Sequence, residues 1–247
     1  MKNFIKLITV AMLLYAPIWA KTTEVLYKVN FGILGELGEA KVVMTTSKDS
    51  YKIDIWAYTT GVVNKLSQNR QEHHTSKGRI INGVLISDSY SVVRSYAKRV
   101  DKKIYNIDHK NKKVTKTNIK LKDGKQASKK TTILPFYSTN DLLSLYGNIS
   151  KEGDTKQPGK KYRYPTVGAE RQDGYIDIIT PTKEELPNYR KALGGDAKWY
   201  YNVVVHQKIF ASNNGEFMLA IDSDGVASSA ILKNLLLFND LKARRVK

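Results

Sequence analysis

Apolar and polar residues alternate along most of this chain. Between residues 24 and 31, Val25, Tyr27, Val29 and Phe31 fall on one face, and Glu24, Lys28 and Asn30 fall on the other. The same period recurs at Tyr51, Ile53, Ile55 and Ala57, and again at Trp199, Tyr201, Val203 and Val205. A period of two residues is that of a strand with one buried face. The pattern therefore predicts a protein built largely from β-strands.

Three glycines separate the first two predicted strands. Gly32, Gly35 and Gly38 stand in "YKVNFGILGELGEAKVV", and the apolar alternation resumes after them at Ala40. A phosphate-binding loop follows a buried strand and opens a helix, whereas here a strand follows a strand. The spacing is also G-x-x-G-x-x-G rather than G-x-G-x-x-G. The glycines predict a hairpin bend, at positions that need a positive φ or close packing.

Turn signals separate further strand-like runs. They are Ser76–Gly83, His109–Lys113, Lys122–Lys125, Asn213–Glu216 and Asp222–Gly225. Many strands joined by short turns are typical of antiparallel all-β folds. The fold class we expect is all-β with minor α, a curved antiparallel sheet forming an open or flattened β-barrel.

Two segments predict short helices that cover the sheet. Residues 138–149 place three leucines near one stripe, and the N-cap is Ser138, Thr139 or Asn140. Residues 180–195 offer a capping box of Thr182 with Glu185, and the regular helix is expected to start at Pro187 and stop at Gly194. The tail, residues 228–245, fits either a closing strand or a basic amphipathic helix, and we favour the strand.

The first 20 residues have the pattern of a secretory signal peptide. Lys2 and Lys6 precede an apolar run, and the segment ends on the small residue Ala20. An uncleaved membrane anchor is the alternative, but a span needs about 20 apolar residues and this run is shorter. We expect cleavage after Ala20 and a single β-rich domain over residues 21–247, with an internal linker at residues 150–161. No later segment is apolar enough to cross a bilayer as a helix.

Charge and cysteine content restrict the partners. The chain of 247 residues has no cysteine, so an exported protein of this sequence holds together by its core and not by disulfides. Without residues 1–20 it carries 39 basic and 23 acidic side chains, a net charge of +16. In an exported protein this charge favours a lipid, a glycolipid or an acidic envelope polymer as partner. A lysine-rich solvated surface is the alternative.

Residues 98–130 hold over half of that excess charge. Thirteen Lys and Arg stand there against three Asp, a net charge of +10 in two predicted hairpins. The candidate contacts to an anionic surface are Lys102, Lys103, Lys112, Lys113, Lys116, Lys120 and Lys122. Alternatively, these lysines keep exposed edge strands from pairing with other chains. Tyr105 is the only aromatic residue of the segment, so single-stranded nucleic acid, which needs stacking platforms, is disfavoured.

The histidines do not form a metal-binding pattern. His73 and His74 are neighbours and point to opposite faces of a strand, so they do not share a metal ion. Glu72 and His74 do share a face, but the usual zinc ligand sets need further partners that the local sequence lacks. His109 in a turn and His206 on a polar strand face are expected to be solvated.

Nucleophile signatures are also missing. The chain has no G-x-S-x-G elbow, and Asp141 with Ser144 is expected to belong to a helix start. Asp54 is expected to face outward and pair with Lys52. An enzyme would need a cleft that brings Asp54 together with Glu72 and His74. We therefore expect a non-catalytic protein without cofactor or metal.

An ordered series of residues resembles a known family. The series comprises Tyr27, Gly32, Gly35, Tyr51, Thr59–Gly61, Leu66, Ser76–Tyr90 and Asn140–Gly147. It resembles an exported bacterial family catalogued as domain of unknown function 3108, over residues 27–147, although members of that family usually have proline where Ser87 stands. The resemblance implies an envelope protein with a curved sheet or open barrel, similar to the half-barrels of lipoprotein carriers that hold acyl chains. It implies no catalytic residues.

Together these features predict a protein in the periplasm of a Gram-negative bacterium. It would bind an amphiphilic or lipidic envelope ligand or assist envelope assembly. The candidate residues lining its cavity are Val29, Phe31, Ile53, Ile55 and Trp199. The alternative is a structural or protein-interaction module of the envelope that docks on a protein partner by its sheet edges or basic hairpins. An interior packed solid with side chains would contradict the ligand-binding prediction.

Overall fold

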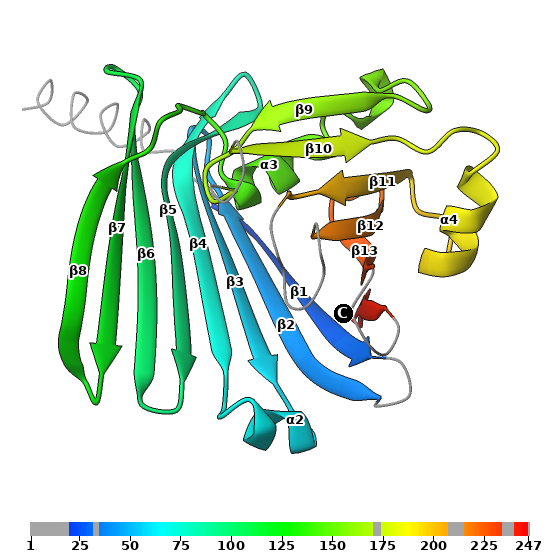
Figure 1. The fold of residues 1–247 in the computed structure, drawn as a ribbon. Coiled ribbons are helices and arrows are strands. Elements are labelled where there is room, and N and C mark those ends of the chain that lie inside the picture. The colour runs from blue at the N-terminus through cyan, green and yellow to red at the C-terminus, as the bar shows by residue number, and fades with distance from the viewer. Residues whose placement is uncertain (1–19, 32–34, 170–173, 207–214, 234–239, 247) are drawn as a thin grey trace, which may run out of the picture.

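A single curved sheet dominates the computed structural model, which describes residues 20–31, 35–169, 174–206, 215–233 and 240–246. Within these residues 14 strands pair in the order β8-β7-β6-β5-β4-β3-β2-β1-β14-β13-β12-β11-β10-β9, each antiparallel to its neighbours (Figure 1). Strands β8 and β9 are the two edges, so the described sheet is not closed. The predicted fold class, an open curved antiparallel sheet, is confirmed.

The strands differ in length between the two parts of the sheet. The long strands are β1 (Lys21–Phe31), β2 (Glu36–Thr46), β3 (Ser50–Thr59), β4 (Gln71–Ile81), β5 (Val84–Tyr96), β6 (Arg99–Asp108), β7 (Lys113–Lys122) and β8 (Lys125–Ile133). The short strands are β9 (Lys161–Pro165), β10 (Tyr175–Ile179), β11 (Trp199–Val204), β12 (Glu216–Ile221), β13 (Ala227–Leu232) and β14 (Leu241–Arg245). The helices are α2 (Gly61–Leu66), α3 (Leu142–Ile149), α4 (Leu186–Leu193) and the 3-10 helix η3 (Gly153–Thr155).

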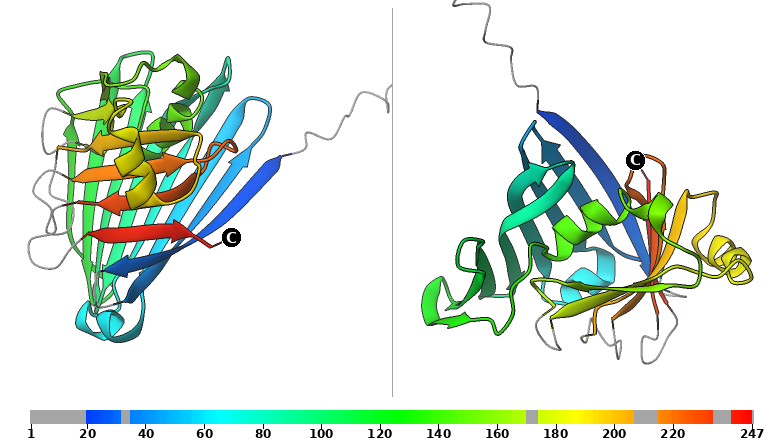
Figure 2. Two further views of the ribbon diagram at one scale, coloured as in Figure 1. Left: turned by 90° about the vertical axis from the view of Figure 1, so that its right-hand side faces the viewer. Right: turned by 90° about the horizontal axis from the view of Figure 1, so that it is seen from above.

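The sheet bends so that the short strands lie across the upper ends of the long ones. Figure 2 shows the short strands β10–β13 directed across the long strands, and the pairing of β1 with β14 joins the two parts. Helix α3 lies between the parts, and α4 covers the far side of the short strands. We call the face of β1–β8 on which α3 lies the concave face, and the opposite face the convex face.

Helix α3 packs against both parts of the sheet. Its Leu143 belongs to a cluster with Tyr51, Ile53, Leu85 and Tyr90 of the long strands. Its Leu145 and Ile149 belong to a second cluster, with Ile178, Tyr201 and Ile221 of the short strands. The helix thus fills the upper interior, so the bent sheet encloses a core there and not an open channel.

The first hairpin confirms the prediction made from its glycines. Strand β1 pairs antiparallel with β2, from Lys21 opposite Thr46 to Asn30 opposite Glu36. Gly35 has a φ of +73°, which side chains rarely adopt. A Cβ at Gly38 would collide with the backbone carbonyl oxygen of Tyr58 on β3. Gly32 lies outside the described residues.

The segment Ser76–Gly83 is mostly strand and not turn. Strand β4 continues to Ile81, and only Asn82 and Gly83 turn, both with positive φ. A Cβ at Gly78 would collide with the carbonyl oxygen of Ile86, and the register between β4 and β5 shifts at this point. Gly78 therefore lets β4 and β5 approach closely. The sequence pattern alone does not distinguish such a glycine from one in a turn.

The predicted helices exist but are shorter than expected. Helix α3 begins after Asp141, which is its N-cap, so the prediction of Ser138, Thr139 or Asn140 as the cap is wrong. Helix α4 starts at Leu186, next to Pro187, and ends before Gly194 as predicted. None of the described helices has the length and apolarity that a membrane span requires.

The C-terminal tail is strand in its described parts. It forms β13 and β14 instead of one closing strand, with residues 234–239 outside the described residues. The segment 150–161 joins α3 to β9 and contains η3. Strands on both sides of it belong to the same sheet. Of the predicted signal peptide, only Ala20 lies among the described residues.

Candidate functional site

The concave face has a sealed upper part built around Asp141. Its Oδ2 accepts hydrogen bonds from the hydroxyls of Ser76 and Ser87, each at 2.5 Å, and its Oδ1 accepts from the amides of Leu143 and Ser144 at 2.7 and 3.0 Å. Asp141 is fully buried. Burial raises its pKa, and the four neutral donors only partly oppose this. No solvent reaches this carboxylate, so it anchors α3 to the sheet rather than acting on a ligand.

A second anchor holds the other end of α3. Asn148 Oδ1 accepts from the amide of Leu85 at 2.8 Å, and its Nδ2 donates to the carbonyl oxygen of the same residue at 2.9 Å. These bonds satisfy two buried backbone groups of β5 in the way a neighbouring strand would. Helix α3 is therefore held over the upper concave face at both ends.

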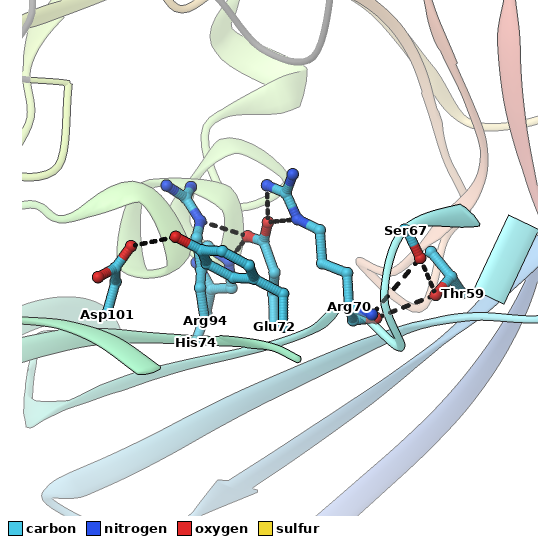
Figure 3. Close-up of polar contacts among 8 residues, drawn as sticks. Thr59, Ser67, Arg70, Glu72, His74, Arg94 and Asp101 are labelled. Atoms are coloured by element: carbon cyan, nitrogen blue, oxygen red, sulfur yellow. Dashed lines mark hydrogen bonds and ion pairs between the residues drawn. The ribbon is translucent and has the colours of Figure 1, made fainter. Parts of the chain in front are cut away.

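Below α3 the concave face carries a row of polar side chains. They are Arg70, Glu72, His74, Arg94 and Asp101, labelled in Figure 3, together with Tyr96, whose hydroxyl donates to Asp101 at 3.3 Å; we call these six residues the polar row. Glu72 is at its centre. Arg70 Nη2 lies 2.6 Å from its Oε1, while Arg94 Nε and His74 Nε2 lie 3.0 and 3.2 Å from its Oε2.

The charges around Glu72 decide its protonation state. Burial of this side chain favours the neutral acid and raises the pKa, but the hydrogen bond with His74 and the positive charges of Arg94 and Arg70 outweigh burial. The pKa of Glu72 is therefore held well below its usual range. Glu72 stays ionised at neutral pH and is neither a general acid nor a base there.

The loop after α2 positions Arg70. The hydroxyl of Thr59 donates to the carbonyl oxygen of Arg70 at 3.1 Å and is 2.9 Å from the hydroxyl of Ser67 (Figure 3). These contacts tie the end of β3 to the start of β4. As a result, the Arg70 guanidinium turns back onto Glu72.

Cross-strand register continues the polar row into an alternating ladder. Glu72 of β4 stands opposite Arg94 of β5, Arg94 opposite Asp101 of β6, and Asp101 opposite Lys120 of β7. Opposite charges facing each other across strands stabilise a sheet, by roughly 0.2–1 kcal/mol per pair. This ladder is balanced in charge and needs no partner.

The next rung of the same face is not balanced. Arg99 of β6 stands opposite Lys122 of β7, and Lys122 opposite Lys125 of β8. We call these three residues the cationic row. Like charges directly opposite each other destabilise a sheet. Among the described residues no carboxylate forms an ion pair with any of the three.

The structure divides the lysines predicted to contact an anionic surface. Alternation along β6 and β7 places four on the concave face and two on the convex face, and the seventh lies in the turn between these strands. The concave group is Lys103, Lys116, Lys120 and Lys122, the convex pair is Lys102 and Lys113, and the turn residue is Lys112.

The apolar residues predicted to line a cavity are also spread out. Ile53 is 1% exposed and packs beneath α3, with Ile55 further along the same face. Val29 and Phe31 lie near the lower end of β1, where β1 pairs with β14. Trp199 belongs to the cluster of the short strands, and its Nε1 donates to Asp154 at 3.0 Å. The five residues therefore do not line one pocket.

Glu72, His74 and Tyr90 are hydrogen-bonded in series, an arrangement that resembles a catalytic relay. Glu72 contacts His74 Nε2, and His74 Nδ1 is 2.9 Å from the hydroxyl of Tyr90. Tyr90, however, is 1% exposed and stacks on Tyr105 with ring centroids 5.7 Å apart. Its hydroxyl is closed to a substrate, so this series of three side chains offers no accessible nucleophile.

Asp54 does not join Glu72 and His74. It lies on the convex face, where Lys52 Nζ is 2.6 Å and His73 Nε2 is 2.8 Å from its carboxylate oxygens. The expected outward pairing with Lys52 is confirmed, as is the placement of His73 and His74 on opposite faces. Among the described residues no three His, Cys, Asp or Glu side chains are arranged to hold a metal ion.

Two histidines predicted to be solvated have partners instead. His109 Nδ1 is 2.8 Å from the hydroxyl of Tyr137, and its Nε2 is 3.0 Å from Asp88. His206 Nε2 is 2.7 Å from Asp177, a carboxylate that Arg163 also binds. Both predictions are wrong because residues distant in sequence approach these rings, which local pattern cannot show.

Sequence reasoning missed most of the residues that organise this face. Ser76, Ser87 and Arg94 interrupt apolar alternation, and an interruption of this kind was the available signal. The position of Asp141 before a leucine-rich stretch was a weaker indication that this residue is buried. Neither signal identifies the partner, because the partners come from other strands.

Comparison with known proteins identifies the fold. The structure is similar to a β-barrel-like protein of domain of unknown function DUF1849 from Brucella abortus, with a TM-score of 0.55 and 10% sequence identity over 91% of this chain and 95% of that one. At this identity the likeness concerns the fold alone. No family model matches the chain. No curated protein matches it either. Membership of domain of unknown function 3108 thus stays a prediction, and this chain has the fold of a β-barrel-like protein.

Proposed function

We propose that this chain is an exported, non-catalytic protein of the bacterial periplasm that binds an amphiphilic, anionic envelope ligand on its concave face. The observation that carries the proposal is the gradation of that face below α3. Strands β1–β3 present apolar side chains, β4–β6 present the charge-balanced polar row, and β6–β8 present the cationic row in the next rung. This order suits a ligand with a hydrocarbon part and a negatively charged head group.

The spacing of strands fits such a ligand. Neighbouring strands lie about 4.8 Å apart, so β3, which carries Ile55, and β7, which carries Lys122, are separated by roughly 19 Å across the sheet. This separation is comparable to the length of a single lipid. The Val29, Phe31 and Ile55 side chains are half-buried, which leaves part of their surface for a ligand.

The cationic row supports the proposal of an anionic head group, because the repulsion among its three cations lowers the stability of the protein. Arg99, Lys122 and Lys125 repel one another in the unliganded protein. Interactions that lower stability without a compensating contact are often retained for binding. An anionic head group placed on the row removes the repulsion and adds charge-assisted hydrogen bonds.

The first test is native mass spectrometry with lipid extraction on protein purified gently from the periplasm. A co-purifying anionic amphiphile in defined stoichiometry is expected. The Lys122→Glu variant is expected to lose it, and Lys102→Glu on the convex face of the neighbouring strand is the matched control. Equal loss in both variants, or a protein that takes up no anionic lipid, would contradict the proposal.

A second function rests on the edge of the sheet. Strand β8 is exposed at nearly every position on both faces, and its outer edge has no described strand beside it. Such an edge can accept an extended segment of another envelope protein. Its lysines also discourage that pairing, so we rank this function second. Cross-linking from β8 to a protein in the periplasm, together with an empty concave face, would reverse the order.

A further inference from the structure

A separate pocket lies at the upper end of the long strands, away from the cationic row. It has a volume of about 190 Å³ and is enclosed by the concave faces of β1–β3, the last turn of α3 and the turn between β12 and β13. Volumes of about 300–1,000 Å³ are typical of sites for drug-sized ligands. This pocket is smaller and suits one hydrocarbon group.

The register of β1 and β2 makes the pocket polar at its mouth and apolar inside. Lys21 stands opposite Thr46 at the strand ends, Thr23 opposite Met44 one step further in, and Val25 opposite Val42 beyond them. Val25 is 1% exposed, as is Ile53 on β3, which also lines the pocket. An apolar cavity of about 150 Å³ stays dry and accepts a molecule such as benzene.

Two glycines line this space at positions that resist substitution. A Cβ at Gly147 would come within 2.6 Å of Leu85 Cδ1, so the packing of α3 on the sheet requires glycine there. Gly225 has a φ of +80° in the turn between β12 and β13. Neither position readily accepts a side chain. The space is therefore built into the way these elements meet.

The mouth of the pocket carries positive charge. Lys21 and Lys151 line it, while the one carboxylate of its lining, Asp224, is paired with Arg245 at 2.7 Å. Lys151 Nζ donates to the carbonyl oxygen of Gly83, which holds the ammonium group beside the mouth. A ligand head group with a negative charge is complementary to these two lysines.

We propose that this pocket binds the end of a single alkyl chain that bears a carboxylate or phosphate head, with the chain against Val25, Val42 and Ile53 and the head between Lys21 and Lys151. The site is distinct from the concave-face site below α3 and does not depend on it. Its smaller volume limits it to a short chain or to one chain end.

Calorimetric titration with octanoate and with octylamine tests this proposal. The two probes share the alkyl chain and differ in head-group charge. The wild-type protein is expected to bind octanoate at least tenfold more tightly than octylamine. Val42→Phe narrows the pocket and is expected to weaken octanoate binding at least tenfold, whereas Val43→Phe, on the opposite face of the same strand, leaves it unchanged.

A mouth variant keeps the test decisive if Val42→Phe does not fold. Lys21 is exposed at the start of β1, and Lys21→Glu is expected to fold, to weaken octanoate binding and to strengthen octylamine binding. Equal affinity for the two probes, or equal octanoate binding by the Val42→Phe and Val43→Phe proteins, would overturn the proposal. The Lys122→Glu protein should bind octanoate as the wild type does, which separates this site from the concave-face site.

Discussion

Two carboxylates on the concave face, Asp141 at the start of α3 and Glu72 on β4, have opposite surroundings. Asp141 lies under α3 and accepts hydrogen bonds from two hydroxyls and two amides. Glu72 lies further down the same face, where Arg70 and Arg94 place positive charge on it. Burial raises the pKa of both groups, but only Glu72 has cations that overcome it, so the pKa of Asp141 is raised and that of Glu72 is lowered.

The difference separates a structural part of the concave face from an electrostatic part. Neutral donors are enough to fix the direction of Asp141 and hold α3 in place, without giving the region a charge. Around Glu72 the guanidinium groups fix both geometry and charge. The upper part therefore resembles an ordinary core, while the lower part remains a charged surface.

The largest effect is expected from removing the upper anchor. Asp141→Ala deletes a helix N-cap, worth about 1 kcal/mol, and leaves the hydroxyls of Ser76 and Ser87 buried without their acceptor, at about 1–3 kcal/mol. Urea unfolding should show a loss of about 3 kcal/mol. Asp141→Asn keeps the cap and should lose less. A loss below about 1 kcal/mol in the alanine variant would mean that α3 docks without this carboxylate.

The second anchor should matter somewhat less. Asn148→Ala removes both partners of the buried backbone amide and carbonyl of Leu85. Leaving these groups unsatisfied should lower the free energy of unfolding by about 2 kcal/mol. Asn111→Ala, in the exposed turn between β6 and β7, is the control and should change it by less than about 0.5 kcal/mol. Similar values for the two variants would refute the role given to Asn148.

The pH dependence of stability should have opposite signs at the two carboxylates. The lowered pKa of Glu72 stabilises the fold above the unfolded value of 4.5, and this contribution is lost as the pH falls towards the folded pKa. The raised pKa of Asp141 means that its contribution is fully present below the unfolded value of 3.8 and is lost as the pH rises through the folded pKa.

Unfolding of the wild type, Glu72→Gln and Asp141→Asn between about pH 7 and pH 3 measures these contributions. The advantage of the wild type over Glu72→Gln should shrink on acidification. Over the same range the free energy of unfolding of the wild type should instead rise relative to that of Asp141→Asn. The same direction of change in both comparisons would show that the two surroundings do not differ as described.

The smallest effect is expected at the cationic row. Lys122→Glu replaces two like-charge cross-strand pairs by two attractive ones and should stabilise the protein by about 0.5 kcal/mol. Lys102→Glu stands opposite Val93 and Ile119 and should have no comparable effect. Melting temperatures at low salt should resolve the gain, and high salt should reduce it. A destabilised Lys122→Glu protein would mean that a nearby carboxylate already balances the charge of the cationic row.

The sequence alone determined the architecture and several local details. Alternation of period two predicted the strands, since burial of one strand face requires it. The glycines predicted the hairpin bend, and the positive φ of Gly35 is a local property of that bend, whereas the close approach at Gly38 is to Tyr58 on β3. The basic segment of residues 98–130 was equally visible, as was the pairing of Asp54 with Lys52.

Only the tertiary structure decided which of these residues act together. The register between β4, β5, β6 and β7 placed Glu72, Arg94, Asp101 and Lys120 in one ladder, and the next rung collected the three cations. It also divided the predicted lysines between two faces and gave Asp141 its serines, which are 65 and 54 residues away in the chain. Alternation specifies the face of a residue within its own strand, whereas cross-strand neighbours depend on how strands distant in sequence are aligned. That alignment is fixed by the packing of the whole sheet around α3.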